Sequence, residues 1–322
     1  MNENRRRVLD LVAAGKISTV EAERLINAIE TSESGFGVDS MVVDVEQEEM
    51  HYLPPIDDSE ANDAPEEKAP STREETFTVG QSPNLIIRGF NGRVLVEAGD
   101  DGVIQMKAKI KRASRVIFEA AQDGDTVTIE AKRKSGGMDL FGRSPGAEIT
   151  VTTPAATSVD LTTSNGTIEL RGIEGSGPVK TSNGRILLEN VKGRHDIRTS
   201  NGRVEVNGME GDGEVRNTNG SIKLLNVRGA FQAFTTNGSI ALEGELAHGT
   251  ACRLESSNGS VHVRLAGEPS LRIDARTSNG RVRSELPDSN VTSQDRNHLV
   301  ATIGVGDGEL FIRTTNGSVL IE

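Results

Sequence analysis

The chain has 322 residues, enough for roughly two domains of ordinary size. It carries 36 Lys and Arg against 48 Asp and Glu, a net charge of −12, with 35 Gly and only eight Phe, one Tyr and no Trp. No stretch approaches the roughly 20 apolar residues of a membrane-spanning helix. A single cysteine, Cys252, excludes an internal disulfide and a multi-cysteine metal site. We expect a cytoplasmic protein without an integral membrane segment; association with a membrane surface and export are the alternatives.

The first thirty residues have the pattern of a helical hairpin. One amphipathic helix runs from Asn4 to Ala14, and Ser18 with Glu21 forms a capping box for a second helix that ends near Glu30. Its inner face is formed by Val20, Leu25, Ile26 and Ile29. Two such short helices bury too little surface to be stable alone. We therefore expect these four residues to dock on a protein partner or a second copy, or on the rest of this chain.

Residues 31–75 carry the whole acidic excess. They hold fourteen acids against two bases and include four prolines, a composition typical of a disordered linker. Residues 76–322 carry 29 charges of each sign and no basic stripe of the kind that nucleic acid requires. We expect a linker over 31–75, a repeat domain over 76–322 and no nucleic-acid partner.

The repeat domain is marked by the dipeptide Asn-Gly. It recurs at four intervals of 18 residues, two of 21 and one of 37, the last interpreted as an unmarked coil plus an insertion. Ser or Thr precedes all eight asparagines, which are Asn165, Asn183, Asn201, Asn219, Asn237, Asn258, Asn279 and Asn316. Three places after each of them stands Ile or Val, and apolar residues alternate with polar ones around it. This alternation is typical of strands with one buried face.

Two architectures use an 18-residue unit with two strands. In an antiparallel meander each Asn-Gly would be a hairpin turn, but the apolar face of the sheet would stay uncovered. In a β-solenoid (parallel β-helix) each unit is one coil, and the apolar faces of the two strand columns cover each other. We predict an all-β solenoid of about twelve coils, with the less regular coils over 77–150 capping one end. Because the chain ends on a repeat strand, we also predict self-association through an uncapped C-terminal coil.

The asparagine column has a structural explanation. Asn-Gly tolerates positive φ, and stacked amides hydrogen-bond between coils. A calcium-binding β-roll needs a second glycine and a regular aspartate in each unit, and this repeat lacks both. We interpret the column as a ladder that holds the coils together.

Few residues offer chemistry. Cys252 shares a column with apolar residues and is expected to fill the core. His195 stands between Gly177 and Gly213 in the same column, where either a small pocket or a packed histidine fits. The other histidines have no metal-ligand spacing, and no acid pair suited to glycoside chemistry stands out. We expect no cofactor, no metal and no catalytic residue.

An outward column gives the strongest hint of a surface site. Lys180, Arg198 and Arg216 occupy equivalent places in three successive units, and Arg276 and Arg313 repeat the pattern later. Phe234 and Glu255 interrupt this column, so it predicts at most a weak surface for anions or for an acidic partner, including the acidic linker.

These units, preceded by the segment Ile149–Pro154, resemble the bacterial toastrack-type β-strand repeat family, also labelled "putative adhesin". The segment Gly15–Ala22 is similar to the helical hairpin found before such domains in proteins of the cell-envelope stress response. The resemblance implies a β-solenoid scaffold, no known enzyme activity and a part in envelope-stress sensing or signalling. It transfers no ligand or catalytic residue.

We therefore expect a non-catalytic binding or scaffold protein that acts through its solenoid surfaces and ends and its tethered hairpin. The alternatives are an exported surface adhesin or carbohydrate binder, and a β-helical polysaccharide-active enzyme. The identity of a small-molecule ligand is not predicted.

Overall fold

A computed structural model describes residues 70–134, 144–246, 248–286 and 290–322. The predicted hairpin over 1–30 and the acidic segment up to residue 69 lie outside the described residues. Strand structure begins at Ser71, so the last five residues of the predicted linker belong instead to the first strand, β1.

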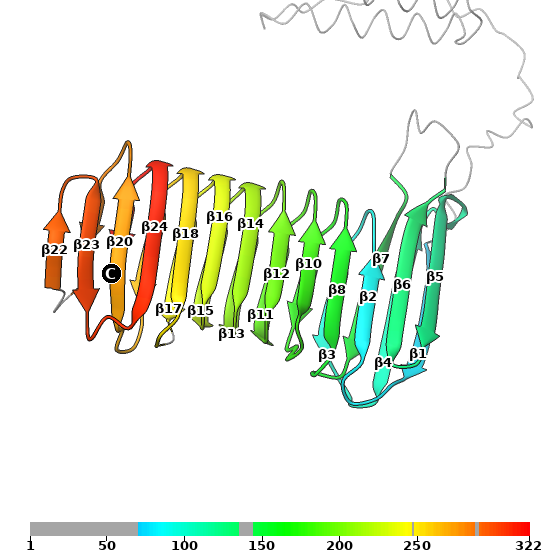
Figure 1. Cartoon of the computed structure of the whole chain (residues 1–322). Coiled ribbons are helices and arrows are strands. Elements are labelled where there is room, and N and C mark those ends of the chain that lie inside the picture. Colours follow the sequence, from blue (N-terminus) through cyan, green and yellow to red (C-terminus); the bar gives the residue numbers. More distant parts are fainter. Residues whose placement is uncertain (1–69, 135–143, 247, 287–289) are drawn as a thin grey trace, which may run out of the picture. The chain divides into compact units, whose positions relative to one another are not determined.

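Two facing sheets account for nearly all of the described chain (Figure 1). Sheet A has twelve strands, in the spatial order β1 (Ser71–Thr78), β4 (Val103–Lys111), β7 (Gly146–Thr153), β3 (Val94–Ala98), β9 (Ile168–Arg171), β11 (Ile186–Lys192), β13 (Val204–Glu210), β15 (Ile222–Arg228), β17 (Ile240–Glu245), β19 (Val261–Leu265), β25 (Val319–Ile321) and β21 (Val282–Ser284). Sheet B has thirteen, in the order β22 (Asn290–Gln294), β23 (His298–Ile303), β20 (Leu271–Thr277), β24 (Gly308–Asn316), β18 (Ala251–Asn258), β16 (Phe231–Asn237), β14 (Gly213–Asn219), β12 (His195–Thr199), β10 (Gly177–Thr181), β8 (Ser158–Thr163), β2 (Asn84–Arg88), β6 (Thr126–Arg133) and β5 (Val116–Asp123). A short 3₁₀ turn, η1 (Ala113–Arg115), precedes β5.

Each repeat unit is one coil that places one strand in each sheet. Ile186 of β11 pairs in parallel with Val204 of β13, and Ile197 of β12 pairs with Val215 of β14, both one repeat further on. From β7 to β21 in sheet A, and from β6 to β20 in sheet B, all neighbouring strands are parallel, which gives ten coils. The predicted β-solenoid is confirmed, and the meander is wrong for these coils. The predicted number of about twelve coils was too high for the described residues, because antiparallel strands take the place of further coils at the N-terminal end and beyond β20.

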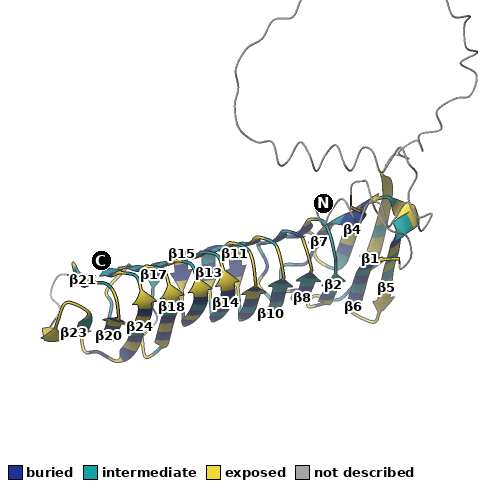
Figure 2. Ribbon diagram, turned by 90° about the horizontal axis from the view of Figure 1, so that it is seen from above, coloured by how far each residue is buried: buried dark blue, intermediate teal, exposed yellow. Residues whose placement is uncertain are grey.

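The core lies between the two sheets, and Figure 2 shows buried residues alternating with more exposed ones along the strands. The residues three places after each repeat asparagine are at most 4% exposed. They are Ile168, Ile186, Val204, Ile222, Ile240, Val261, Val282 and Val319. Burial of these β-branched columns is the main favourable term for the stack.

The glycine of each Asn-Gly is required by the close approach of successive coils. A Cβ on Gly184 would lie 1.8 Å from the carbonyl oxygen of Gly166, and one on Gly202 would lie 1.9 Å from that of Gly184. Neither glycine has a positive φ, and neither does any of the eight asparagines. The expectation that these pairs mark positive φ was therefore wrong, because the constraint is the space between backbones.

The N-terminal end is closed by antiparallel strands, as predicted for 77–150. Strand β4 pairs antiparallel with both β1 and β7, and β5 forms a hairpin with β6. The chain order is also broken here, because the coil β2/β3 lies between the later coil β6/β7 and the coil β8/β9. The first coil of the sequence is therefore covered on both sides.

The C-terminal coil is likewise internal. Strand β24 pairs with β18 on one side and β20 on the other, while β25 lies between β19 and β21. Beyond β20, the hairpin β22/β23 continues sheet B in antiparallel pairing. The long interval between Asn279 and Asn316 thus holds a capping hairpin and not an unmarked coil. The premise of an uncapped terminal coil was wrong, because that coil has a neighbour on each side; self-association itself stays a prediction.

Candidate functional site: the outer face of sheet B

The eight repeat asparagines form a continuous amide ladder along one corner of the solenoid. Each Nδ2 donates to the Oδ1 of the asparagine in the preceding coil, as from Asn183 to Asn165 at 2.8 Å and from Asn201 to Asn183 at 2.7 Å. The ladder starts at Asn91. It passes from Asn258 to Asn316 before reaching Asn279, which follows the spatial order of the coils. One donor and one acceptor of each internal amide are thus used between coils.

A second ladder, which the sequence analysis missed, lies two residues before the asparagines. Thr199 donates its hydroxyl to the carbonyl of Gly184 at 3.2 Å, and Ser256 donates to that of Gly238 at 2.8 Å. The full set is Thr181, Thr199, Asn217, Thr235, Ser256, Thr314 and Thr277. Its signal in the sequence is a short polar residue recurring inside an apolar column, which marks a buried group with a fixed partner.

The two candidate reactive residues of the interior are packed. His195 is fully buried, and its two ring nitrogens lie 3.2 Å from the Gly177 carbonyl and 3.3 Å from the Lys192 carbonyl. Burial lowers its pKa, against the opposing effect of both carbonyls. Burial also raises the pKa of Cys252 to about 12, and its thiol donates to the Phe231 carbonyl at 3.1 Å. Such a protonated thiol is no nucleophile.

The predicted basic column exists, but its members are already paired. Lys180, Arg198 and Arg216 stand side by side in register on the outer face of sheet B. The Arg198 Nε donates to Asp196 at 2.7 Å, and Lys180 lies 3.6 Å from the same carboxylate. Glu214 accepts from Arg216 at 2.5 Å. These acids stand two residues earlier on the same strands, so the column forms a row of surface ion pairs.

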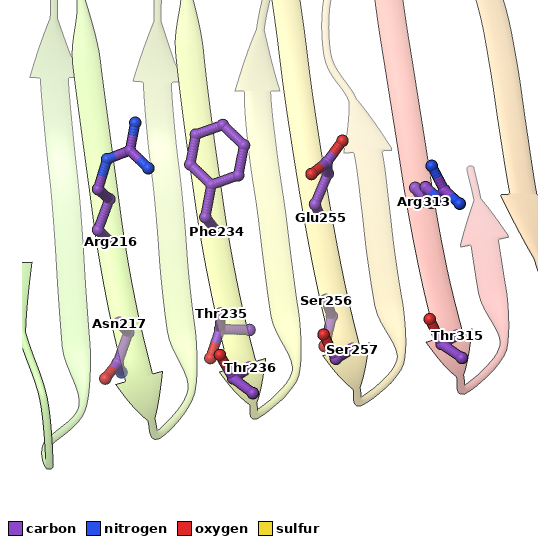
Figure 3. A pocket seen from close by; sticks show the side chains of 10 residues that line it. All are labelled: Arg216, Asn217, Phe234, Thr235, Thr236, Glu255, Ser256, Ser257, Arg313 and Thr315. Carbon is purple, nitrogen blue, oxygen red and sulfur yellow. The ribbon is translucent and has the colours of Figure 1, made fainter.

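The pairing pattern changes over β16, β18 and β24. Phe234 takes the next place of the column, and the Arg216 guanidinium lies 4.8 Å from the centre of its ring. In the following strand the order of charges is reversed, because Arg253 stands two residues before Glu255 and donates to it at 2.8 Å. Figure 3 shows the Phe234 ring between Arg216 and Glu255, with Arg313 beyond them.

A shallow hollow lies over these strands. Its floor is polar, with Arg216, Phe234, Glu255 and Arg313 along one row, and it is completed by Asn217, Thr235, Thr236, Ser256, Ser257 and Thr315. A second hollow on the other side of Arg313 is lined by Arg276, Phe311 and His298. Arg253 lies 4.9 Å from the centre of the Phe311 ring. Two phenyl rings, each stacked with an arginine, therefore flank this part of the face.

Arg276, which lines the second hollow, is held in place by an ion pair with Asp274. Its Nε and Nη2 donate to the two oxygens of Asp274 at 2.8 and 2.9 Å, and His298 Nε2 lies 3.1 Å from the same carboxylate. Burial tends to raise the pKa of Asp274, but the hydrogen bonds from Arg276 and His298 outweigh it and the pKa is lowered. Asp274 is therefore charged at neutral pH and neutralises Arg276.

One cluster has the composition of a hydrolase triad without its geometry. The carboxylate of Asp307 accepts from the hydroxyl of Ser270, which lowers the pKa of Asp307, and also lies 3.2 Å from Nδ1 of His248. A nucleophilic serine must bond to the imidazole, which takes its proton. Here the carboxylate stands between the two groups, so this cluster cannot activate Ser270.

Within the described ranges, no group of three or more His, Cys, Asp or Glu side chains could hold a metal ion. The described part of the chain also contains no helix with the length and apolar character needed to cross a membrane.

Comparisons with known proteins place most of the chain in one family. The Toastrack DUF4097 family model matches residues 85–322, and a SHOCT-like domain model matches residues 3–34. A search of curated proteins found no significant match.

The chain is also similar to solved structures. A "putative adhesin" from Bacteroides fragilis is 13% identical, with a TM-score of 0.44, over 78% of this chain and 97% of that one. A "putative cell adhesion protein" from Clostridium sporogenes is 13% identical, with a TM-score of 0.26, over 78% of this chain and 99% of that one. A "putative lipid binding protein" from Parabacteroides distasonis is 14% identical, with a TM-score of 0.26, over 79% and 97%. Because the family model covers the whole series of repeat coils, this chain belongs to the Toastrack DUF4097 family.

Proposed function

We propose that this protein is a non-catalytic binding and scaffold protein in cell-envelope stress sensing or signalling, located in the cytoplasm or at the membrane surface. The observation that carries the proposal is the filled interior of the solenoid. Its apolar columns, its only cysteine and His195 are all buried between the sheets. The hollows over the described coils open outward and are lined mainly by polar and charged side chains. Binding is therefore the work of the outer faces and of the N-terminal segment.

The N-terminal hairpin is proposed as the second binding element. Its match to a SHOCT-like domain supports a small module distinct from the solenoid. The four apolar residues of its inner face, Val20, Leu25, Ile26 and Ile29, are proposed to dock on a protein partner, with the acidic segment as a tether.

The test is a crosslinking experiment on the full chain in cells under envelope stress. Replacing Leu25 and Ile26 together by Asp should remove a defined set of crosslinked proteins, because a charge cannot be buried unpaired at a docking face. Glu23→Gln, on the same predicted helix, is the matched control and should keep that set. An unchanged set in the double variant would contradict the proposed docking face.

An exported carbohydrate binder is the second candidate. It is favoured by the two neighbouring hollows, in which Phe234 and Phe311 respectively lie beside arginines and hydroxyl groups on an open face. Cell fractionation separates the two candidates, since recovery of the full chain outside the cytoplasm would favour this second function.

A further inference from the structure

Arg313 differs from the other arginines in its column. The guanidiniums of Arg198, Arg216 and Arg276 are each bonded to an acid two residues earlier on the same strand. Two residues before Arg313 stands Phe311, which carries no charge. Its neighbour in register, Glu255, is already engaged by Arg253. Among the described residues, no acidic side chain forms an ion pair with Arg313, which is exposed.

The charge of Arg313 is therefore available to a ligand. On one side it borders the hollow of Phe234 and Glu255, and on the other it borders the hollow of Phe311 and Arg276. A guanidinium binds a carboxylate through two parallel hydrogen bonds. The half-buried phenyl rings on either side offer apolar surface within the same site.

A row of hydroxyl groups runs beside the arginine. Thr236, Ser257 and Thr315 occupy the exposed place before the asparagine in three neighbouring coils. Successive rungs of the ladder are about 4.8 Å apart, which is close to the length of one sugar residue in an extended chain. A ligand lying along the solenoid axis would thus meet one hydroxyl for each sugar.

The backbone of this region is closed to an added strand. Strands β16, β18 and β24 are each paired on both sides, so their amides and carbonyls are used within sheet B. An extended peptide binds mainly by adding its backbone to a sheet edge, and no such edge is present here. Recognition must rely on side chains, namely hydroxyls, a guanidinium and phenyl rings, which suit a sugar ring that carries a carboxylate.

We propose that the outer face of sheet B around Arg313 binds an acidic polysaccharide, with Arg313 holding the carboxylate of one uronate residue and the Phe234 and Phe311 rings contacting the apolar faces of the sugars. This proposal rests on the proposed binding function in one respect: both assume that ligands bind to the outer face of the solenoid.

The test uses the full chain and calorimetric titration with three probes: an oligogalacturonate, a neutral glucose oligomer of equal length and poly-glutamate. We expect the oligogalacturonate to bind at least about tenfold more tightly than either of the others. Its affinity should fall as salt is raised, because the contact with Arg313 is exposed to solvent.

Three single substitutions locate the site. Arg313→Gln should weaken oligogalacturonate binding about tenfold or more, because the charged fork is lost. Arg198→Gln is the matched control in the same column, and it should leave binding unchanged because Arg198 is occupied by Asp196. Glu255→Gln should tighten binding by about threefold, since it removes a like charge beside the ligand. Thermal unfolding of each variant verifies that the solenoid is intact.

Several results would overturn the proposal: no binding of oligogalacturonate, equal binding of the neutral oligomer or of poly-glutamate, or equal losses in Arg313→Gln and Arg198→Gln. None of these results would affect the crosslinking through Leu25 and Ile26. The acidic-sugar site and the proposed partner docking can therefore fail independently.

Discussion

The middle of the solenoid and its two ends differ in the order in which their coils stack. From the coil β8/β9 to the coil β18/β19 in the middle, successive coils of the sequence lie next to one another, with one register shift between β15 and β17. At both ends the order is broken, since β2/β3 and β24/β25 are enclosed by coils that are not all their sequence neighbours. A repeat array can propagate in one dimension, but its ends need a different device to avoid exposed strand edges. Here that device is an out-of-order coil combined with antiparallel strands.

Deleting a coil tests this difference with the largest expected effect. Removal of residues 308–322 should leave β18 and β20 without their shared neighbour, so we expect a misfolded or aggregating chain. Light scattering and thermal unfolding measure this outcome.

The matched deletion removes residues 219–236 and joins Thr218 to Asn237. It takes out one full repeat from the middle, so that the coil β13/β14 becomes the neighbour of the coil β17/β18. We expect a soluble, folded chain with a modestly lower melting temperature. Equal damage from the two deletions would show that the ends are not special.

A methyl group between coils should have the next largest effect. In Gly202→Ala the new Cβ would lie 1.9 Å from the Gly184 carbonyl oxygen, so the backbones must separate. We expect a loss of about 3 kcal/mol or more in the free energy of unfolding, measured by denaturant titration. The control is Gly124→Ala, whose Cβ meets nothing within 4 Å but whose φ is 55°, and it should cost only about 1 kcal/mol. A similar loss in both variants would contradict the steric explanation.

Replacing an asparagine of the ladder should cost more stability at an internal position than at the end of the ladder. Asn201→Ala removes two amide hydrogen bonds, one to Asn183 and one from Asn219. At about 0.5 to 1 kcal/mol for each exposed bond, the loss should be about 1 to 2 kcal/mol. Asn279 donates only to Asn316 at the end of the ladder, so Asn279→Ala should lose about half as much. Equal losses in denaturant titrations would show that the amides do not act as a ladder.

The buried His195 should make a smaller, pH-dependent contribution to the free energy of unfolding. Burial lowers its pKa in the folded state below the value of about 6.5 in the unfolded chain. The unfolded state therefore binds the proton more tightly, and stability that is present above pH 6.5 is lost as the pH falls through the folded pKa. Between pH 7.5 and 5.5 the free energy of unfolding should fall by up to about 1 kcal/mol from this group.

The variant His195→Gln keeps a donor for the two carbonyls and removes the titration. Its loss of stability over the same pH interval should be smaller than that of the parent chain. An identical pH dependence in the two proteins would rule out His195 as the source.

Much of the fold could be predicted from the sequence. The same pattern of apolar and polar residues recurs in every repeat unit. It was enough to predict the buried columns around Ile186 and Ile197, the burial of Cys252 and the stacking of Asn165 with Asn183. The site was predicted less completely. The basic column was found, but the acids that neutralise it were missed, although Asp196 and Glu214 stand two residues before Arg198 and Arg216 on the same face.

The sequence by itself determined the length of a coil, the residues that face inward and the family to which the chain belongs, because these depend on local alternation repeated many times. Only the tertiary structure decided where the last coil lies, how the ends of the coil stack are arranged and that Arg313 has no acidic partner among the described residues. Repeated units offer nearly equivalent surfaces to one another, so their order in space depends on long-range pairing that no single unit encodes. For the same reason, the surroundings of Arg313 become defined only when β24 enters between β18 and β20.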